Sequence, residues 1–413
     1  MDNETIDFEQ VVAKGCGLDV HKETVVATVS GTGIKRETRT FSTFTRSLKE
    51  LKEWILSLGI THVAMESTGI YWKPVFNILE DSGLTILIVN ARHIKYVPGH
   101  KTDKKDSAWI SKLLLAGLLK GSFVPPVEIR QLRDMTRYRR KLQGAITAEK
   151  NRMIKMLEDS NMKLSTVLSK VHGVSGTRIV DALLEGQTDP EYLASLCHGK
   201  VKAEQEDIIL ALEGNLTEHH KFMIRIIRQD IRQTESLIKE LDVEIEKQLL
   251  PYAQEIALLS QIPGVGEQTA GELISEIGVD MEVFATEKHI SSWAGVSPGN
   301  NESAGKKKSG RTTHGNKQVK AILTESAWAA SRTKDTFLSS KYKKLVGKRG
   351  KKRAVVAVAH AILVIAYHLI KEKTNFIELG ANHVDEKKRE AQLKYYQKRI
   401  EELGAEKPET QST

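Results

Sequence analysis

The stretch GCGLDVHKETVVATVS, Gly15–Ser30, decides the fold because it contains two strand-like runs in succession, each rich in residues that favour extended structure. A third strand-like run follows at 37–43. Beyond it, helical spacing of apolar residues alternates with short apolar runs typical of buried strands. These later segments cover 47–59 (helix), 61–67 (strand), 71–83 (helix) and 84–90 (strand). The order β-β-β-α-β-α-β-α predicts a mixed sheet with helices packed on it.

The total charge indicates what kind of partner the chain has. Its 413 residues include 62 Lys or Arg and 53 Asp or Glu, which gives a formal net charge of +9. An excess of positive charge favours a polyanionic partner such as nucleic acid. The length and a hydrophobic content of 40% allow two or three domains, each with its own core.

The remaining composition excludes several other classes of protein. The two cysteines, Cys16 and Cys197, form no metal-binding motif and are expected to be reduced thiols in a cytosol. The acidic N-terminus is unlike a signal peptide. The longest apolar run, Ala354–Ile370, is short for a membrane span and contains His360 and His368. We therefore expect a buried helix there, no membrane partner, and a location in a bacterial or archaeal cytosol.

The middle of the chain, residues 126–255, is predicted to be long helices with a compact helical insertion between them. Residues 129–159 form one helical pattern that is rich in arginine, including Arg137, Arg139 and Arg140. A later helix carries a seam with spacings of four and three, formed by Ile227, Ile231, Thr234, Ile238, Leu241 and Ile245. This seam is consistent with an antiparallel helix pair, with a coiled coil between subunits, or with a helical linker packed on its own domain. The arginines are candidate contacts to nucleic-acid phosphates.

A glycine-containing turn opens the third part of the chain. The segment IPGVGEQTAGELI, 262–274, resembles a helix-hairpin-helix, in which Gly264 and Gly266 would bring backbone N–H groups close to a phosphate. The alternative is a simple glycine turn between two helices. A weaker copy of the same pattern lies at 170–179. We expect residues 256–375 to be mainly helical and residues 376–413 to be a charged, partly disordered tail.

Four acids are placed to meet at one edge of the predicted sheet. Asp19 lies near the end of the first strand, Glu66 ends the fourth strand, and Asp103 and Asp106 share one face at the start of a later helix. Carboxylates gathered in this way repel one another unless a cation is present. Mg²⁺ prefers oxygen ligands, and two such ions can clamp a scissile phosphate.

The surroundings of the acids support the same interpretation. Lys101, Lys104 and Lys105 flank the last two acids and would suit a passing nucleic-acid backbone. Taken singly, each acid also has an ordinary structural explanation as a turn residue, a surface acid or a helix cap. Together, in this strand order, they favour a metal site, with Mn²⁺ as the alternative ion. The pattern resembles the RNase H-like fold of Holliday-junction resolvases of the RuvC type.

A second constellation lies downstream, in the loop WAGVSPGNNESAGKKKSGRTTHGN, 293–316. Ser303 sits in this loop, and a basic group follows it, formed by Lys306, Lys307, Lys308 and Arg311. A serine hydroxyl must be activated before it can act as a nucleophile, and neighbouring cations would hold a phosphate and offset its charge. By chemistry alone, Ser297 and Ser309 are rival candidates.

The two constellations together resemble the DEDD-type transposases of insertion sequences, which are relatives of the Piv DNA invertases. Six stretches that span Gly17–Ile370 carry the resemblance: GLDVHKE, MESTGIYWKPV, KTDKKDSAWISKLL, IPGVGEQTA, WAGVSPGNNESAGKKKSGRTTHGN and RGKKRAVVAVAHAILVIAYHLI. The resemblance implies a RuvC-like domain at 1–125 and a transposase domain at 256–375.

The resemblance also implies roles for particular residues. The four acids of the family fall on Asp19, Glu66, Asp103 and Asp106. The nucleophilic serine, in a P-x-x-x-x-S-G setting, falls on Ser303 after Pro298, although Ala304 stands where the family has glycine. Members of the family use a non-coding bridge RNA that pairs with donor and target DNA.

We therefore expect a recombinase that moves its own insertion sequence through phosphoserine intermediates. It would use Mg²⁺, bind donor and target DNA and a guide RNA, and act as a dimer or tetramer. The alternative is a metal-dependent, structure-specific endonuclease of the Holliday-junction type. A DNA-binding protein without catalysis is a third hypothesis, which the complete set of four acids disfavours.

Overall fold

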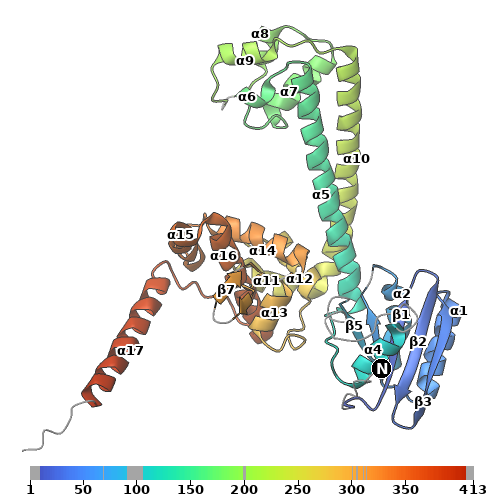
Figure 1. Cartoon of the computed structure of the whole chain (residues 1–413). Helices are drawn as coiled ribbons and strands as arrows, with labels where there is room; N and C mark the ends of the chain where they lie inside the picture. Colours follow the sequence, from blue (N-terminus) through green and yellow to red (C-terminus); the bar gives the residue numbers. More distant parts are fainter. Residues whose placement is uncertain are drawn as a thin grey trace, which may run out of the picture. The chain divides into compact units, whose positions relative to one another are not determined.

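The computed structural model describes residues 10–67, 69–90, 106–198, 201–299, 301–303, 306–309, 311–312 and 314–405 (Figure 1). The chain divides into two compact units, Met1–Val124 and Pro125–Thr413. The first boundary lies next to the one predicted at residue 125. The further divisions at 255 and 375 fall inside the second unit and stay predictions.

The first unit is built on a five-stranded mixed sheet. Its strands lie in the order β3-β2-β1-β4-β5, with antiparallel pairing of β1 to β2 and of β2 to β3, and parallel pairing of β1 to β4 and of β4 to β5. The strands are β1 (Lys14–Val20), β2 (Thr24–Gly31), β3 (Ile34–Ser42), β4 (His62–Glu66) and β5 (Thr85–Val89). The helices are α1 (Thr45–Ser57), α2 (Trp72–Leu79), the short η1 (Glu80–Ser82) and α4 (Asp106–Leu115). This arrangement confirms the predicted mixed α/β domain and its order of elements.

Apolar side chains of the sheet and of α1 form the core of this unit. Helix α1 buries Leu48, Leu51, Trp54 and Ile55, the positions that the helical spacing predicts. The ring of Trp54 lies 5.6 Å from that of Phe41 on β3, measured between centroids. Burying this stripe against the strands stabilises α1, whose N-cap lacks a side-chain hydrogen bond.

Helix α4 lies unusually close to β1. A Cβ atom on Gly17 would stand 2.2 Å from the backbone oxygen of Ser107 and 2.4 Å from the backbone nitrogen of Ser111, so only glycine fits there. Small hydroxyl side chains also hold α4 to the neighbouring strand β2: Thr28 bonds Ser107 at 2.8 Å and Ser30 bonds Ser111 at 2.7 Å, oxygen to oxygen. This contact determines where the first residue of α4, Asp106, lies relative to β1.

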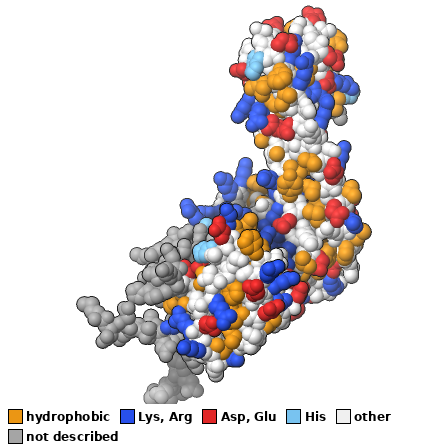
Figure 2. All heavy atoms as spheres, turned by 90° about the vertical axis from the view of Figure 1, so that its right-hand side faces the viewer, with side chains coloured by type: hydrophobic (Ala, Val, Ile, Leu, Met, Phe, Trp, Pro, Cys, Tyr) orange, Lys and Arg blue, Asp and Glu red, His pale blue; other side chains and the backbone are white. Residues whose placement is uncertain are grey.

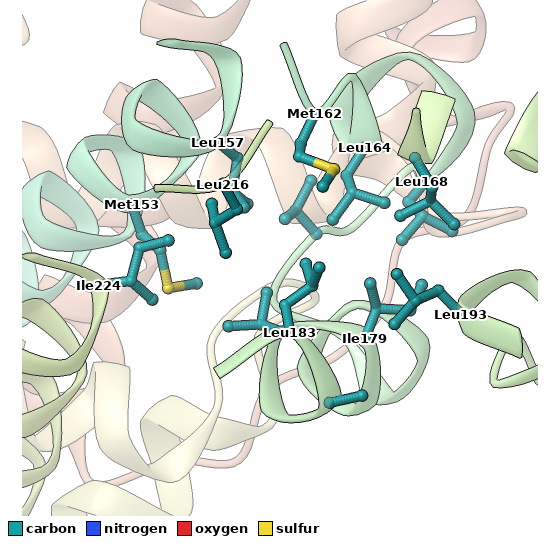
Figure 3. Packing of buried hydrophobic residues seen from close by; sticks show 14 of the residues in the cluster. Met153, Leu157, Met162, Leu164, Leu168, Ile179, Leu183, Leu193, Leu216 and Ile224 are labelled. Carbon is teal, nitrogen blue, oxygen red and sulfur yellow. The ribbon is translucent and has the colours of Figure 1, made fainter. Parts of the chain in front are cut away.

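The second unit contains a long helix pair, α5 (Val127–Asp159) and α10 (Glu218–Leu249), which run antiparallel along each other (Figure 1). Thr217 caps α10, because its hydroxyl accepts from the His220 backbone while His220 Nδ1 accepts from the Thr217 N–H. Four short helices lie at one end of the pair: α6 (Leu164–Val167), α7 (Val174–Leu184), α8 (Pro190–Ser195) and α9 (Gln205–Leu212). Their apolar residues join those of the two long helices in one core (Figure 3).

The seam that the sequence predicts on α10 is used inside the chain. Ile227, Ile231, Thr234, Ile238 and Ile245 are buried within a single copy, and α10 packs along α5. Of the three interpretations left open, the intramolecular antiparallel pair is the correct one. A second copy cannot use this seam for dimerisation without displacing α5, so self-association would need another surface.

The rest of the second unit surrounds one apolar helix, α16 (Lys351–Glu372), which packs against α11, α13, α14 and α15. These neighbours and the remaining elements are η3 (Leu250–Tyr252), α11 (Ala253–Ser260), α12 (Glu267–Ile277), α13 (Glu287–Trp293), β6 (Asn301–Ser303), β7 (Lys306–Ser309), α14 (Lys317–Ala330), α15 (Phe337–Arg349) and α17 (His383–Ala405). By length and composition α16 could cross a membrane, but 61% of its most apolar window is buried. This burial confirms the predicted buried helix. Within the predicted tail, 383–405 is helical.

Replacing Gly17 by alanine tests the close contact between β1 and α4. We expect Gly17→Ala to lower the free energy of unfolding by roughly 1–3 kcal/mol, because a backbone must shift to admit the methyl group. Gly121→Ala is the matched control in the same unit, since its nearest neighbour would be a side-chain atom at 3.6 Å. Thermal and urea unfolding of the two variants would measure the difference. Equal stabilities would show that α4 does not rest on Gly17.

A pair of adjacent residues tests the α5–α10 seam. Ile238 is 7% exposed and Leu237 is 45% exposed. We expect Ile238→Ala to cost about 2–5 kcal/mol and Leu237→Ala less than about 0.5 kcal/mol. Light scattering should give the same molecular mass for both variants and the wild type. A change of mass in Ile238→Ala without loss of stability would place the seam between subunits instead.

Candidate acidic site and serine hairpin

The strand order brings Asp19 and Glu66 to neighbouring positions. Strands β1 and β4 pair in parallel, with Leu18 opposite Met65, and the two acids are the next residue on each strand. Both therefore lie at the same edge of the sheet, at the ends where these parallel strands finish. The side chain of Asp19 is 17% exposed.

The third acid joins them from α4, because Asp106 is the first residue of that helix. Burial raises the pKa of Asp19, a charge interaction and a hydrogen bond with His21 lower it, and the nearby carboxylates of Asp106 and Glu66 raise it again. The net effect is a raised pKa. Three of the four predicted acids thus lie close enough to act on one another electrostatically.

The fourth predicted acid, Asp103, lies outside the described residues, as do Lys101, Lys104 and Lys105. Within the described part of the chain, no group of three His, Cys, Asp or Glu side chains is arranged to hold a metal ion. Glu66 and Asp106 act electrostatically on the half-buried Asp19, and carboxylate oxygens are ligands that Mg²⁺ and Mn²⁺ prefer. A divalent cation here would also relieve the repulsion by Asp106 and Glu66, which adds to the effect of burial on the pKa of Asp19. The donor chemistry of these acids therefore suits a divalent metal.

Sequence reasoning missed His21 as part of this site. Its Nε2 lies 3.0 Å from Oδ2 of Asp19, and its ring is 61% exposed. The signal was present in the sequence, because residues two apart in an extended segment lie on the same side. When protonated, His21 would offset part of the negative charge of Asp19.

Ser303 lies on a two-stranded hairpin formed by β6 and β7. The strands pair antiparallel, with Ser303 opposite Lys306. At the base of the hairpin, the Gly299 N–H donates to the Arg311 carbonyl at 2.8 Å, and Pro298 and Thr312 form an isolated antiparallel β-bridge. Side chains within 301–310 lie outside the described residues, so the roles predicted for Ser303, Lys306, Lys307 and Lys308 stay predictions. The backbone does place Ser303 and Lys306 as cross-strand neighbours.

The base of this hairpin is tied to α12 and α14. A Cβ atom on Gly315 would stand 2.2 Å from the Gly295 backbone nitrogen, so the two ends of the loop touch. Asn316 then caps α14, because its side-chain oxygen accepts from the backbone N–H groups of Gln318 and Val319 at 2.9 and 3.3 Å. Its side-chain nitrogen donates to Glu276 on α12 at 2.8 Å.

Glu276 is a buried acid whose partners come from two helices. Its side chain is 2% exposed, and Arg137 on α5 donates to both carboxylate oxygens, at 2.6 and 2.8 Å. Arg133 on the same helix donates to the Glu276 carbonyl at 2.6 Å. Burial lowers the pKa of Arg133 to about 10, which leaves it charged at neutral pH. A buried carboxylate needs such partners, so this network fixes α5 against α12 and the hairpin base.

The arginines predicted to follow nucleic-acid phosphates already have acidic partners within the second unit. Arg137 binds Glu276, Arg139 binds Asp242, and Arg140 binds both Glu272 and Glu325. High arginine density on a helix predicts a basic surface, but the sequence does not reveal which acids fold against it. The structure therefore favours a structural role for these three side chains.

The glycine turn between α11 and α12 also has a packing explanation. Gly264 has φ +86°, and a Cβ atom there would stand 2.4 Å from the Ser326 carbonyl oxygen and 2.6 Å from the Ala330 nitrogen, both on α14. Packing against α14 therefore requires glycine at position 264. Gly266, the N-cap of α12, has open space around it and no side-chain cap. Packing therefore explains the glycine at position 264 but not the one at position 266.

Comparison with known proteins assigns the class of protein that this fold and site define. A family model described as "Transposase", of the DEDD type, matches 16–162, and a model described as "Transposase IS116/IS110/IS902 family" matches 256–343. The matched segments together cover more than half of the chain and include all four predicted acids and Ser303. No curated protein matches the chain.

The chain belongs to the DEDD-type IS110 family of insertion-sequence transposases, so it is a DNA transposase or recombinase with DNA as a partner. Domains of the DEDD type typically depend on divalent metal ions, which agrees with the acids gathered around Asp19.

Substituting Asp19 tests whether these acids hold a cation. A raised pKa means that ionised Asp19 costs stability, and the favourable contribution of its protonated form is lost as the pH rises through the raised value. At neutral pH we therefore expect Asp19→Asn to melt at a higher temperature than the wild type in chelator. Excess Mg²⁺ or Mn²⁺ should raise the melting temperature of the wild type and leave that of Asp19→Asn unchanged.

Glu23→Gln, an exposed acid in the following turn, is the control and should respond to the cation as the wild type does. Equal stabilisation of Asp19→Asn and the wild type by the cation would contradict a metal site at Asp19.

Proposed function

We propose that this transposase cuts and rejoins DNA at the ends of its own insertion sequence through a covalent phosphoserine intermediate. The observation that carries the proposal is the presence of two constellations in one chain. Asp19, Glu66 and Asp106 interact electrostatically in the first unit, and Ser303 lies on a hairpin whose base is fixed by Gly299, Gly315 and Asn316. A nuclease that uses water needs only the first constellation.

The acids supply the metal-binding part of the reaction. Asp19, Glu66, Asp103 and Asp106 would hold Mg²⁺, as two ions or with Mn²⁺ in its place, and the bound metal would polarise the scissile phosphate. His21 would keep Asp19 oriented through its hydrogen bond. Lys101, Lys104 and Lys105 would lie along the DNA backbone beside the acids.

Ser303 supplies the attacking oxygen. Its Oγ forms a bond to phosphorus while the bond from phosphorus to the leaving deoxyribose oxygen breaks, and the proton lost by the serine balances the one taken up by the leaving hydroxyl. The serine ester conserves the energy of the broken phosphodiester. An incoming DNA hydroxyl can then attack the same phosphorus and release Ser303. Lys306, Lys307, Lys308 and Arg311 would offset the phosphate charge during both steps.

Further features of the proposal rest on the family resemblance and on charge. A non-coding bridge RNA would pair with donor and target DNA, and the net charge of +9 is compatible with both kinds of nucleic acid. The turn at Gly266 would act as the phosphate-binding part of a helix-hairpin-helix. The α5–α10 pair would serve as a coiled-coil arm, and a dimer or tetramer in a bacterial or archaeal cytosol would hold two cut duplexes together.

The second candidate function is a metal-dependent, structure-specific endonuclease. The acids gathered at Asp19 favour it, because carboxylates that bind metal can activate water without a serine. The two functions differ in one product. Only the recombinase forms a covalent bond between protein and DNA.

A serine substitution tests this difference. We expect Ser303→Ala to bind DNA normally, form no covalent adduct and give no recombinants, because the attacking oxygen is missing. Ser297→Ala and Ser309→Ala, in the same loop, should keep adduct formation. Denaturing electrophoresis of end-labelled DNA after incubation with each variant would detect the adduct. A labelled adduct that persists in Ser303→Ala would refute the serine assignment, and cleavage without any adduct in the wild type would favour the endonuclease.

A further inference from the structure

The corner between α15 and α16 is a strongly basic segment that lies outside both the acidic site and the serine hairpin. Eight Lys or Arg residues fall within 341–353, and no Asp or Glu occurs from Thr336 to Lys371. On the face that Figure 2 shows, basic side chains lie among acidic ones. The corner begins at the end of the segment matched by the second family model, which finishes at residue 343.

Six of the eight cations at this corner are exposed. Within the described part of the chain, no acidic side chain pairs with any of these six exposed residues: Lys343, Lys348, Arg349, Lys351, Lys352 and Arg353. The arginines of α5 are the opposite case, since Arg137, Arg139 and Arg140 all have acidic partners. Positive charge at the corner is therefore available to a partner outside the chain.

Helix electrostatics make the arrangement costly for the free protein. Lys348 and Arg349 end α15, where cations are favourable, but Lys351, Lys352 and Arg353 occupy the first turn of α16, where the helix dipole repels them. That turn has no acid, and its N-cap, Gly350, has no side chain to accept from the free N–H groups. An anion lying against the corner would reverse both effects.

The composition of the corner indicates how such an anion is recognised. The exposed cations have long, flexible side chains and are not interleaved with exposed aromatic or amide groups, so they suit phosphates and not base edges. Nearby Tyr342 has its ring against that of Trp328, with 5.9 Å between centroids. A membrane surface is a poorer match, because the apolar side of α16 is buried among its own neighbouring helices.

We infer that Lys348, Arg349, Lys351, Lys352 and Arg353 form a binding surface for the phosphate backbone of duplex DNA, which holds the DNA without reading its sequence. The inference rests on DNA being the substrate of this family and is independent of the serine chemistry. Such a surface positions the duplex, while sequence selection takes place elsewhere.

The test compares two triple variants that remove the same net charge. In the first, Lys348, Lys351 and Lys352 are replaced by alanine. In the control, Arg232, Lys239 and Lys247 are replaced by alanine. These three residues are exposed on α10, and acidic residues occur between them in the sequence. Fluorescence anisotropy would measure the affinity of the full-length protein for a duplex of arbitrary sequence and for an element-end duplex, over a range of salt concentrations.

We expect the corner variant to bind both duplexes roughly tenfold more weakly or worse, and its plot of log Kd against log salt to lose about 0.9 in slope for each phosphate contact removed. The α10 control should keep the slope of the wild type. Ser303→Ala should also keep it, so failure of the serine proposal would leave this result unaffected. An unchanged slope in the corner variant, or weaker binding to only one of the two duplexes, would overturn the inference.

Two further measurements separate this effect from misfolding and from RNA binding. Without DNA, the corner variant should melt at about the same temperature as the wild type, since it loses two cations that oppose the α16 dipole and one that favours the α15 dipole. A clearly lower melting temperature would show that these lysines stabilise the fold. Substituting the three lysines by arginine should preserve DNA binding. Loss of affinity for single-stranded RNA alone, with duplex DNA unaffected, would assign the corner to RNA and refute the DNA surface.

Discussion

The packing of the second unit depends on the hydrogen bonds that the buried Glu276 carboxylate accepts from Arg137 and Asn316. A buried charge is tolerated only when it is paired and hydrogen-bonded, and removing one partner from such a pair costs about 3–5 kcal/mol. Glu276 meets this requirement with Arg137 from α5 and Asn316 from the start of α14. One side chain thereby connects the long helix pair to the base of the hairpin that carries Ser303. The constraint is geometric as well as energetic, because an arginine that donates through two nitrogens to one carboxylate fixes their relative orientation.

The first unit is organised around an unfavourable interaction instead. Its topology places Asp19 beside Glu66 and brings Asp106 to both, so that burial and like charges raise the pKa of Asp19. Proteins often keep a destabilising arrangement of this kind at a functional site, where a bound ligand offsets its cost in folding stability. The structure around these acids is tightly packed. Helix α4 lies against Gly17 with no room for a methyl group, and Thr28 and Ser30 each form a hydrogen bond to a serine of α4.

Positive charge serves two purposes in this chain, and the structure separates them. The arginines of α5 hold helices together, because Glu276, Asp242, Glu272 and Glu325 fold against them. None of the cations from Lys348 to Arg353 has an acidic ion-pair partner in the described part of the chain, and the last three of them lie in the first turn of α16, where the helix dipole repels them. The excess charge of +9 is therefore a poor guide by itself to the position of a nucleic-acid surface.

Local periodicity was enough to predict the order of strands and helices in the first unit, the apolar face of α1 and the buried helix α16, since each depends on spacing within one segment. The same spacing predicted the seam of α10, but whether α5 or a second copy fills it depends on chain direction after the insertion, which periodicity does not contain. The acids at Asp19, Glu66 and Asp106 were predictable because they lie at the ends of regular elements. Glu276 and the packing requirement at Gly264 were not, since each is defined by contacts between segments distant in the chain. Sequence thus determined which elements form and which acids come together at the end of the sheet. Tertiary structure decided which charged side chains form ion pairs within the protein, because ion pairing depends on distances that only packing sets.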